Sequence, residues 1–242
     1  MSKLADYLFH EEPGITLYCG DCRIILPLLR CPNTSYCLEA CDGRCGLESA
    51  AVVTDPPYGV SAVRPDGKMG GTSRDIKRWR GQINPTYAPI FGDDKPIDPS
   101  PLLAFGRRHI IWGGNYIADR LPPSPAWLVW YKRINGQAND FADCELAWTD
   151  LEMPARVFQH LWMGMLRDSE RGVHDHPTQK PTALISWCLS FVPDGVIIDP
   201  YAGSGTTLEA AKSLNRRAIG IEISPDYCEI AVKRLRQEVL AL

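Results

Sequence analysis

Short β-rich runs alternate with helical patterns along this chain of 242 residues, and that alternation limits its possible folds more than any other feature. Such an order favours an α/β sheet whose parallel strands are joined by crossover helices. Strands are expected at seven places, namely 15–19, 50–54, 109–113, 127–131, 144–149, 196–199 and 217–222. Helices are expected at 22–29, 99–106, 115–120, 181–191, 205–214 and 225–239. We predict a single α/β domain over residues 1–242, with a seven-stranded, mostly parallel sheet and helices on both faces.

Charge and hydropathy limit the partners of such a domain. The formal net charge is −3, so a surface that binds nucleic acid has to be a local patch of basic residues. Apolar runs such as 126–131 are too short to cross a bilayer. No charged and then apolar leader opens the sequence. We therefore expect a cytoplasmic protein without a membrane partner.

The segment Asp55-Pro56-Pro57-Tyr58 is the first candidate site. It follows an apolar run at 50–53, so Asp55 leaves the carboxyl end of a strand, where open α/β sheets bind their ligands. The prolines have no N–H group, which leaves their carbonyl oxygens as acceptors. A carboxylate and a carbonyl can accept the two hydrogens of an NH2 group on a planar base, while an aromatic ring stacks on the face of that base. These four residues are predicted to be catalytic residues acting on an exocyclic amine.

A glycine-containing turn is the second candidate site. It follows the strand at 196–199 and leads into a helix, and its two glycines allow the backbone to turn tightly against a ligand. Glu222 ends the next strand, nineteen residues after Gly203, where an acid can accept hydrogen bonds from ribose hydroxyls. The pattern predicts an adenosine-containing cofactor, either a dinucleotide or S-adenosylmethionine. The candidate binding residues of the turn are Asp199, Pro200, Ala202, Gly203, Ser204, Gly205, Thr206 and Thr207.

Together, these two motifs resemble the catalytic and cofactor motifs of the amino-group DNA methyltransferases. The catalytic motif comes first along the chain, an order that resembles the circularly permuted β group, which includes solitary, phage-borne and restriction-associated enzymes. The resemblance covers most of residues 14–58 and 109–238. It implies a Rossmann-like methyltransferase domain, S-adenosylmethionine as methyl donor, DNA as partner, and a bacterial, archaeal or phage origin.

Two further segments resemble that family. Asp21 and Cys22 stand at the end of an amino-terminal strand, where the family places an acid against the adenine amine of the cofactor. The run at 176–181 looks like the segment that closes over the methionine end of the cofactor, which implies a contact from Thr178 or Lys180. The resemblance also implies direct in-line methyl transfer to a base flipped out of the duplex. Adenine N6 is the expected acceptor, because relatives that act on cytosine often carry serine in place of Asp55.

A Cys-rich insertion at 31–48 departs from the compact spacing of the family. In a cytosolic chain, crowded cysteines point to a metal more readily than to disulfides. A structural zinc site and a set of unpaired thiols are the two alternatives. The candidate ligands are Cys31, Cys37, Cys41 and Cys45.

A basic loop is expected at 60–98, and we predict that it contacts the DNA phosphates. Its first part carries six basic residues against Asp66 and Asp75, a local charge of +4. A solvated loop without a partner is the alternative interpretation. The candidate DNA-binding residues are Arg64, Lys68, Arg74, Lys77, Arg78 and Arg80.

Three other functions fit parts of the pattern. N4-cytosine methylation needs the same geometry as N6-adenine methylation. A non-catalytic DNA-binding relative would keep the fold without turnover. A nicotinamide-dependent dehydrogenase is disfavoured, because the third glycine of the dinucleotide fingerprint is missing after Gly205. A homodimer is compatible with the resemblance, and so is a restriction endonuclease partner.

Overall fold

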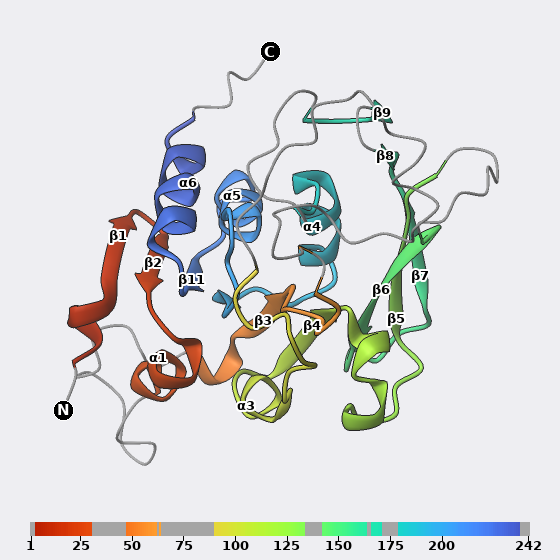
Figure 1. Ribbon diagram of the computed structural model, residues 1–242, viewed down its shortest axis with the longest axis horizontal. Coiled ribbons are helices and arrows are strands. Elements are labelled where there is room, and N and C mark those ends of the chain that lie inside the picture. The colour runs from red at the N-terminus through yellow and green to blue at the C-terminus, as the bar shows by residue number, and fades with distance from the viewer. Residues whose placement is uncertain are drawn as a thin grey trace.

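The computed structural model of the chain describes residues 3–30, 47–61, 63, 90–133, 142–163, 166–170 and 179–237 (Figure 1). The predictions for the Cys-rich insertion and for most of the basic loop fall on 31–46 and 64–89, which lie outside the described residues. Within the described part of the chain, no helix is both long enough and apolar enough to cross a membrane.

One large sheet runs through the molecule, with the strand order β1-β2-β11-β10-β3-β4-β6-β5-β7 among the described residues. Five neighbouring pairs in it are parallel and three are antiparallel. The predicted mostly parallel α/β sheet is therefore confirmed. The strands are β1 (Leu8–Glu12), β2 (Ile15–Cys19), β3 (Ala51–Thr54), β4 (Arg108–Trp112), β5 (Trp127–Tyr131), β6 (Cys144–Thr149), β7 (Arg156–Gln159), β10 (Ile197–Asp199) and β11 (Ala218–Glu222), and a separate ribbon pairs β8 (Trp162–Met163) with β9 (Leu166–Arg167).

The large sheet has nine strands in the described part of the chain, where seven were predicted. All seven predicted strands are present, with bounds that differ from the prediction by one residue at most. The additional strands β1 and β7 lie at the two edges of the sheet and are largely exposed. An edge strand buries little of its surface, so its sequence lacks the apolar run that marks the central strands.

Helices cover both faces of the sheet, as predicted. In Figure 1, α4 (Thr182–Leu189), α5 (Thr206–Ser213) and α6 (Pro225–Leu235) lie on one side, while α1 (Cys22–Leu29) and α3 (Ser100–Leu103) lie on the other. The predicted helix at 115–120 is replaced by two short 3-10 turns, η3 (Gly114–Tyr116) and η4 (Ala118–Arg120). Two further 3-10 turns are η1 (Leu4–Tyr7) and η2 (Leu47–Ser49).

Each face of the sheet has its own hydrophobic core. Consecutive strand residues point to opposite faces, so Val53 packs with α4, α5 and α6, while Val52 packs with α1 and α3. Both valines are 0% exposed. Burial on both faces explains why these central strands are continuous apolar runs in the sequence.

The chain reverses its winding direction at the pair β10–β3. From β10 it continues through α5 to β11 on one side, whereas β3 leads through α3 to β4 on the other. Open α/β sheets bind ligands at such a switch point, beyond the carboxyl ends of the strands. Both predicted site motifs follow these two strands, so the topology brings them together.

Two glycines with similar backbone conformations provide a test of helix packing. Gly205 (φ +82°) precedes α5, and a Cβ built there would lie 2.8 Å from the Cβ of Ala231 in α6. At Gly92 (φ +78°), no described atom lies within 4 Å of such a Cβ. We predict that Gly92→Ala lowers the free energy of unfolding by about 1 kcal/mol, the cost of the left-handed backbone alone. Gly205→Ala should lower it by about 2 to 4 kcal/mol, because overpacking is added.

Equilibrium denaturation with urea measures both values. Equal losses in the two variants would mean that the contact between α5 and α6 has no part in the requirement for glycine.

Candidate active site

A cleft of about 1150 Å³ opens at the carboxyl ends of β2, β11, β10 and β3. All four residues of the predicted catalytic segment, Asp55 to Tyr58, line it on the side of β3. The cleft is large enough for a cofactor together with a planar base. The predicted cofactor-binding residues that line it are Asp21, Cys22, Lys180, Asp199, Pro200, Ala202, Gly203, Ser204, Thr206, Thr207 and Glu222.

Gly205 and Thr178 are the two predicted cofactor residues that are not in this lining. Thr178 lies outside the described residues. Gly205 faces Ala231 of α6, which explains the need for glycine there, and its predicted contact with the cofactor stays a prediction. The candidate zinc ligands Cys31, Cys37, Cys41 and Cys45 lie outside the described residues, as do the candidate DNA-binding residues Arg64, Lys68, Arg74, Lys77, Arg78 and Arg80.

Glu222 organises the glycine turn. Its carboxylate accepts hydrogen bonds from the backbone N–H groups of Gly203 and Ser224, both at 2.8 Å. Burial raises the pKa of Glu222, although these backbone hydrogen bonds oppose the shift. The side chain lines the cleft at the end of β11. A carboxylate has further acceptor positions, which fit the hydroxyl groups of a ribose.

Gln179 is a cleft residue that the sequence analysis did not select. The residue is 8% exposed, and its side-chain amide nitrogen donates to Glu170 at 2.8 Å. Among the described atoms, its side-chain oxygen has no hydrogen-bond partner. A buried acceptor without a partner is costly unless a ligand or water satisfies it. Together with Glu222, this oxygen makes the donor and acceptor set of the cleft fit a polar, adenosine-containing cofactor.

Asp21 caps α1 at the end of β2. Its carboxylate accepts a hydrogen bond from the backbone N–H of Arg23 at 2.8 Å and forms an ion pair with the side chain of Arg23 at 2.5 Å. These interactions with Arg23 hold the pKa of Asp21 below its ordinary value. Burial raises the pKa of the neighbouring Cys22 thiol, which is hydrogen-bonded to Tyr201. Cys22 therefore presents a neutral thiol to the cleft.

Asp199 joins the two strands of the switch point. It is 3% exposed and accepts a hydrogen bond of 2.6 Å from the Thr54 hydroxyl at the end of β3. It also accepts one of 3.1 Å from the backbone N–H of Tyr201. Burial raises the pKa of Asp199 to about 6, against the opposing hydrogen bonds from Thr207 and Thr54. Through these contacts, Asp199 holds the start of the glycine turn next to the catalytic segment.

Two donors occupy the carboxylate of Asp55. The Tyr58 hydroxyl donates to one oxygen at 2.5 Å, and the Lys180 ammonium donates to the other at 2.5 Å. Lys180 is 5% exposed and also lies 3.1 Å from the Tyr58 hydroxyl. Burial raises the pKa of Asp55, and Lys180 opposes that shift. Lys180 was predicted to contact the cofactor, and the structure places its ammonium on the catalytic carboxylate.

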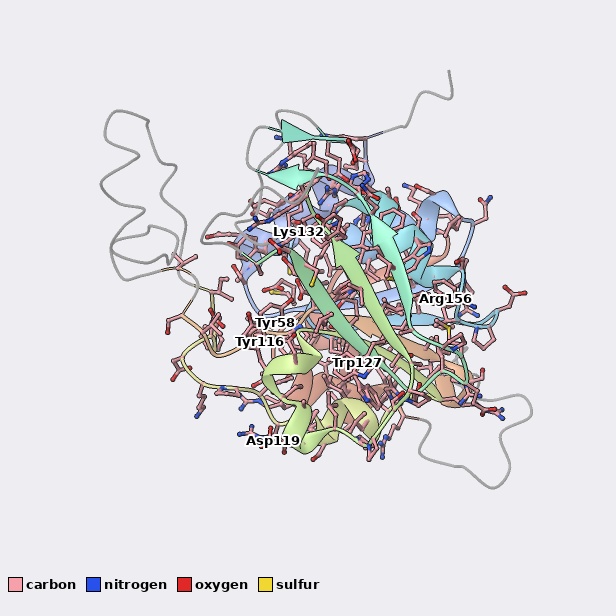
Figure 2. All side chains as sticks on the ribbon, turned by 90° about the vertical axis from the view of Figure 1, so that its right-hand side faces the viewer. Tyr58, Tyr116, Asp119, Trp127, Lys132 and Arg156 are labelled. Atoms are coloured by element: carbon pink, nitrogen blue, oxygen red, sulfur yellow. The ribbon has the colours of Figure 1, made fainter. Side chains whose placement is uncertain are left out.

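The ring of Tyr58 is held in place by its neighbours. It stacks on Tyr116 with ring centroids 5.0 Å apart and an interplanar angle of 19°, and Figure 2 shows the two rings next to one another. A Cβ at Gly113 would lie 2.0 Å from the Tyr58 ring, so only glycine fits beneath it. Tyr58 lines the cleft, and its partner Tyr116 is 47% exposed.

Asp93 fixes the chain that follows the catalytic segment. Its carboxylate accepts hydrogen bonds from the backbone N–H groups of Gly59 at 2.7 Å and Val60 at 3.2 Å. Asp93 belongs to the described end of the predicted basic loop and is 5% exposed. The two ends of that loop therefore lie side by side at the mouth of the cleft.

The sequence analysis missed two charged residues, Glu145 and Lys132, that are linked to Asp55 through Lys180. Glu145 in β6 lies 3.1 Å from the Lys180 ammonium and 2.7 Å from that of Lys132, which follows β5. Burial acts to raise the pKa of Glu145, but the two lysines outweigh it and lower the pKa to about 2. Charged residues inside or next to apolar strands were the signal that could have pointed to them.

Arg234 of α6 was also missed. It is 7% exposed, and it donates to the hydroxyls of Ser204 at 3.2 Å and Thr206 at 3.0 Å in the glycine turn. Its guanidinium forms ion pairs with Glu170 at 2.9 Å and Glu209 at 2.6 Å. This buried network ties the glycine turn to Glu209 in α5 and to Glu170, which accepts a hydrogen bond from the backbone N–H of Thr182 at the start of α4.

The raised pKa of Asp199 predicts a specific pH dependence of stability. A carboxyl whose pKa is raised on folding binds its proton more tightly in the folded state, so the stability it confers falls as the pH rises from about 4 to about 6. Asp199→Asn removes this titration while keeping an acceptor oxygen. We predict that the difference in the free energy of unfolding between the variant and the wild type shifts in favour of the variant by up to about 3 kcal/mol from pH 4 to pH 7.

Urea denaturation at both pH values measures the difference, and Asp119→Asn is the control, because the Asp119 side chain is 76% exposed. A constant difference between the Asp199→Asn variant and the wild type would contradict the assigned role of burial.

Comparison with known proteins places this chain in a family. Residues 111–233, about half of the chain, match the model of a family described as DNA methylase. The type II methyltransferase M.ScaI of Streptomyces caespitosus is 46% identical over an alignment of 273 residues, which covers 97% of this chain and 85% of the relative. M2.DpnII of Streptococcus pneumoniae is 35% identical over 114 residues. That alignment covers 46% of this chain and 42% of the length of the relative.

Solved structures share the fold. The crystal structure of the M1.HpyAVI–SAM complex has a TM-score of 0.51 and 20% identity, with 92% of this chain and all of that chain covered. The PvuII DNA methyltransferase, described as cytosine-N4-specific, has a TM-score of 0.51 and 16% identity, with 96% and 92% covered. At these identities, the likeness shows a common fold.

Proposed function

The chain belongs to the DNA methylase family matched by its residues 111–233, and we propose that it transfers a methyl group from S-adenosylmethionine to N6 of adenine in DNA. One observation carries this proposal. Asp55 and Pro56 of the catalytic segment line the same cleft as the glycine turn and Glu222. An enzyme that methylates an amine has to bring these two kinds of site within reach of each other.

The residues around the glycine turn would hold the cofactor. We assign Glu222 to the ribose hydroxyls and Asp21 to the adenine amine, with Gln179 and Lys180 near the opposite end of the cleft. The solved structure of M1.HpyAVI with SAM, which has the same fold, supports this choice of cofactor. When bound, S-adenosylmethionine supplies an electrophilic methyl group on a sulfonium, which is a good leaving group.

The catalytic segment acts on the target amine. The amine of a base is a weak nucleophile, because its lone pair is delocalised into the ring. Hydrogen bonds from its two hydrogens to Asp55 and to the Pro56 carbonyl favour a pyramidal nitrogen. As the new N–C bond forms by direct in-line transfer, the nitrogen loses one hydrogen as a proton, and Asp55 is the acceptor. The aromatic pair of Tyr58 and Tyr116 offers a stacking surface to a base flipped out of the duplex.

The choice of base within this proposal rests on Asp55. A carboxylate at this position favours adenine, because relatives that act on cytosine often carry serine there. N4-cytosine methylation is the alternative, and the cytosine-N4-specific PvuII enzyme has the same fold. A DNA-binding relative without turnover is disfavoured by the complete catalytic segment, which lines the cleft with Glu222.

Other parts of the proposal concern residues outside the described ranges. We propose that the loop at 60–98 contacts DNA phosphates through its basic residues, and that the cysteines of the insertion at 31–48 bind zinc. The names of the type II relatives support a role in restriction and modification, alongside a restriction endonuclease.

Asp55→Ala tests the catalytic assignment. We predict that it lowers the rate of methyl transfer to DNA by more than about 10²-fold, because the amine loses its hydrogen acceptor and its proton acceptor. Binding of S-adenosylmethionine should change by less than about twofold, because Glu222 and the glycine turn remain intact. Transfer of a tritiated methyl group and calorimetric titration measure the two quantities.

Asp119→Ala removes an exposed carboxylate in η4, whose position is labelled in Figure 2, and serves as the control. Near-wild-type methylation by Asp55→Ala would remove Asp55 from the mechanism.

The identity of the methylated base is a separate prediction. DNA from a methylation-free host that expresses this chain should contain N6-methyladenine, because Asp55 is the acceptor of the amine hydrogens. Mass spectrometry of the nucleosides identifies the base, and single-molecule sequencing gives its sequence context. Detection of N4-methylcytosine alone would replace the adenine assignment with the alternative.

A further inference from the structure

A buried ammonium contacts the carboxylate that is proposed to bind the target amine. Lys180 lies 2.5 Å from Asp55 and 3.1 Å from the Tyr58 hydroxyl, and its side chain is 5% exposed. Tyr58 and Lys180 already donate to the two oxygens of Asp55, so the amine of the base competes with the Lys180 ammonium for the oxygen that it contacts. A buried cation without a counterion is strongly disfavoured, so Lys180 needs another carboxylate within reach.

Glu145 provides that carboxylate. Glu145 belongs to β6, and one of its oxygens lies 3.1 Å from the Lys180 ammonium. Its other oxygen lies 2.7 Å from Lys132. The side chains of Glu145 and Lys132 are 25% and 19% exposed, so water screens this group of charges only in part. Asp55, Glu145 and the two lysines sum to zero charge, and a small shift of Lys180 toward Glu145 keeps that balance within the cluster.

We propose that Glu145 is a positioning residue, which takes over the Lys180 ammonium when the target amine displaces it from Asp55. This inference rests on the proposed amine methylation. Without Glu145, the ammonium has Asp55 as its remaining carboxylate partner among the described residues and competes with the amine for it. The expected defect is therefore in turnover, and the binding of the cofactor at the glycine turn is spared.

The pH dependence of turnover distinguishes this role from a structural one. The groups that face Asp55 are Lys180, Tyr58, Glu145 and Asp199. Turnover requires ionised Asp55, so the rate rises with pH through the pKa of that carboxyl. The negative charge of Glu145 raises the pKa of Asp55, and Lys180 lowers it. Removing the charge of Glu145 leaves Lys180 on Asp55 and moves the acid limb of the rate profile to lower pH.

Glu145→Gln in the full chain is the direct test. We expect its plateau kcat to fall roughly tenfold or more, with the acid limb at lower pH than in the wild type. The Kd for S-adenosylmethionine should stay within about twofold of the wild-type value. Glu145→Asp keeps the charge, so it should lose less activity and keep the wild-type acid limb. Glu152→Gln is the matched control, because the Glu152 side chain is 88% exposed in its contact with Arg108.

Lys132→Met distinguishes the contributions of the two lysines that contact Glu145, because it removes Lys132 and leaves Lys180 in place. Because it removes the partner that does not contact Asp55, it should leave the acid limb at or above the wild-type pH. Wild-type kcat in Glu145→Gln would overturn the proposal. A fall in kcat with an unmoved acid limb and a lower unfolding temperature would also overturn it, by assigning Glu145 a structural role. If the wild type itself transfers no methyl group to DNA, the proposed function fails first.

Discussion

The hydrogen bond between the Thr54 hydroxyl and Asp199 joins the ends of β3 and β10, and the arrangement of the site depends on it. The two strands are parallel neighbours, so their carboxyl ends already lie at one edge of the sheet. The bond fixes how the chain leaves each strand, with the catalytic segment on one side and the glycine turn on the other. Its acceptor is a buried carboxyl, which the fold retains although burial raises its pKa to about 6. The buried carboxyl lowers the folding stability at neutral pH, and its hydrogen bonds position the two segments of the site.

Charged residues organise the part of the site around the catalytic residue Asp55. The catalytic carboxylate is kept in a partly buried cluster with Lys180, Glu145 and Lys132, whose charges cancel. A low-dielectric surrounding strengthens each interaction in such a cluster and makes any unpaired member costly. The carboxylate therefore stays ready to accept hydrogen bonds without standing alone in the interior. At the glycine turn, Arg234 is the central cation, and its guanidinium contacts two hydroxyls and two carboxylates.

Local patterns predicted the central sheet well because its strands are buried on both faces. The β3 run Ala51–Thr54 is apolar apart from its last residue, and the structure has a strand there. The edge strands β1 and β7 lack that signal, and η3 and η4 replace a predicted helix, because Gly113 and Gly114 allow the chain to turn at the end of β4. Lys132 and Glu145 escaped notice because their partnership arises from the pairing of β5 with β6 and from the approach of Lys180.

The sequence by itself determined which segments form strands and which two of them end in chemically active motifs, because both properties are carried by consecutive residues. Tertiary structure alone decided that Lys180 lies on Asp55, that Gly205 packs against α6, and that Glu145 and Arg234 stand behind the two motifs. These contacts join residues far apart in the chain, and their strength comes from shared burial away from water. Burial of this kind exists only after the sheet and both helical layers have assembled, so no local pattern of residues encodes it.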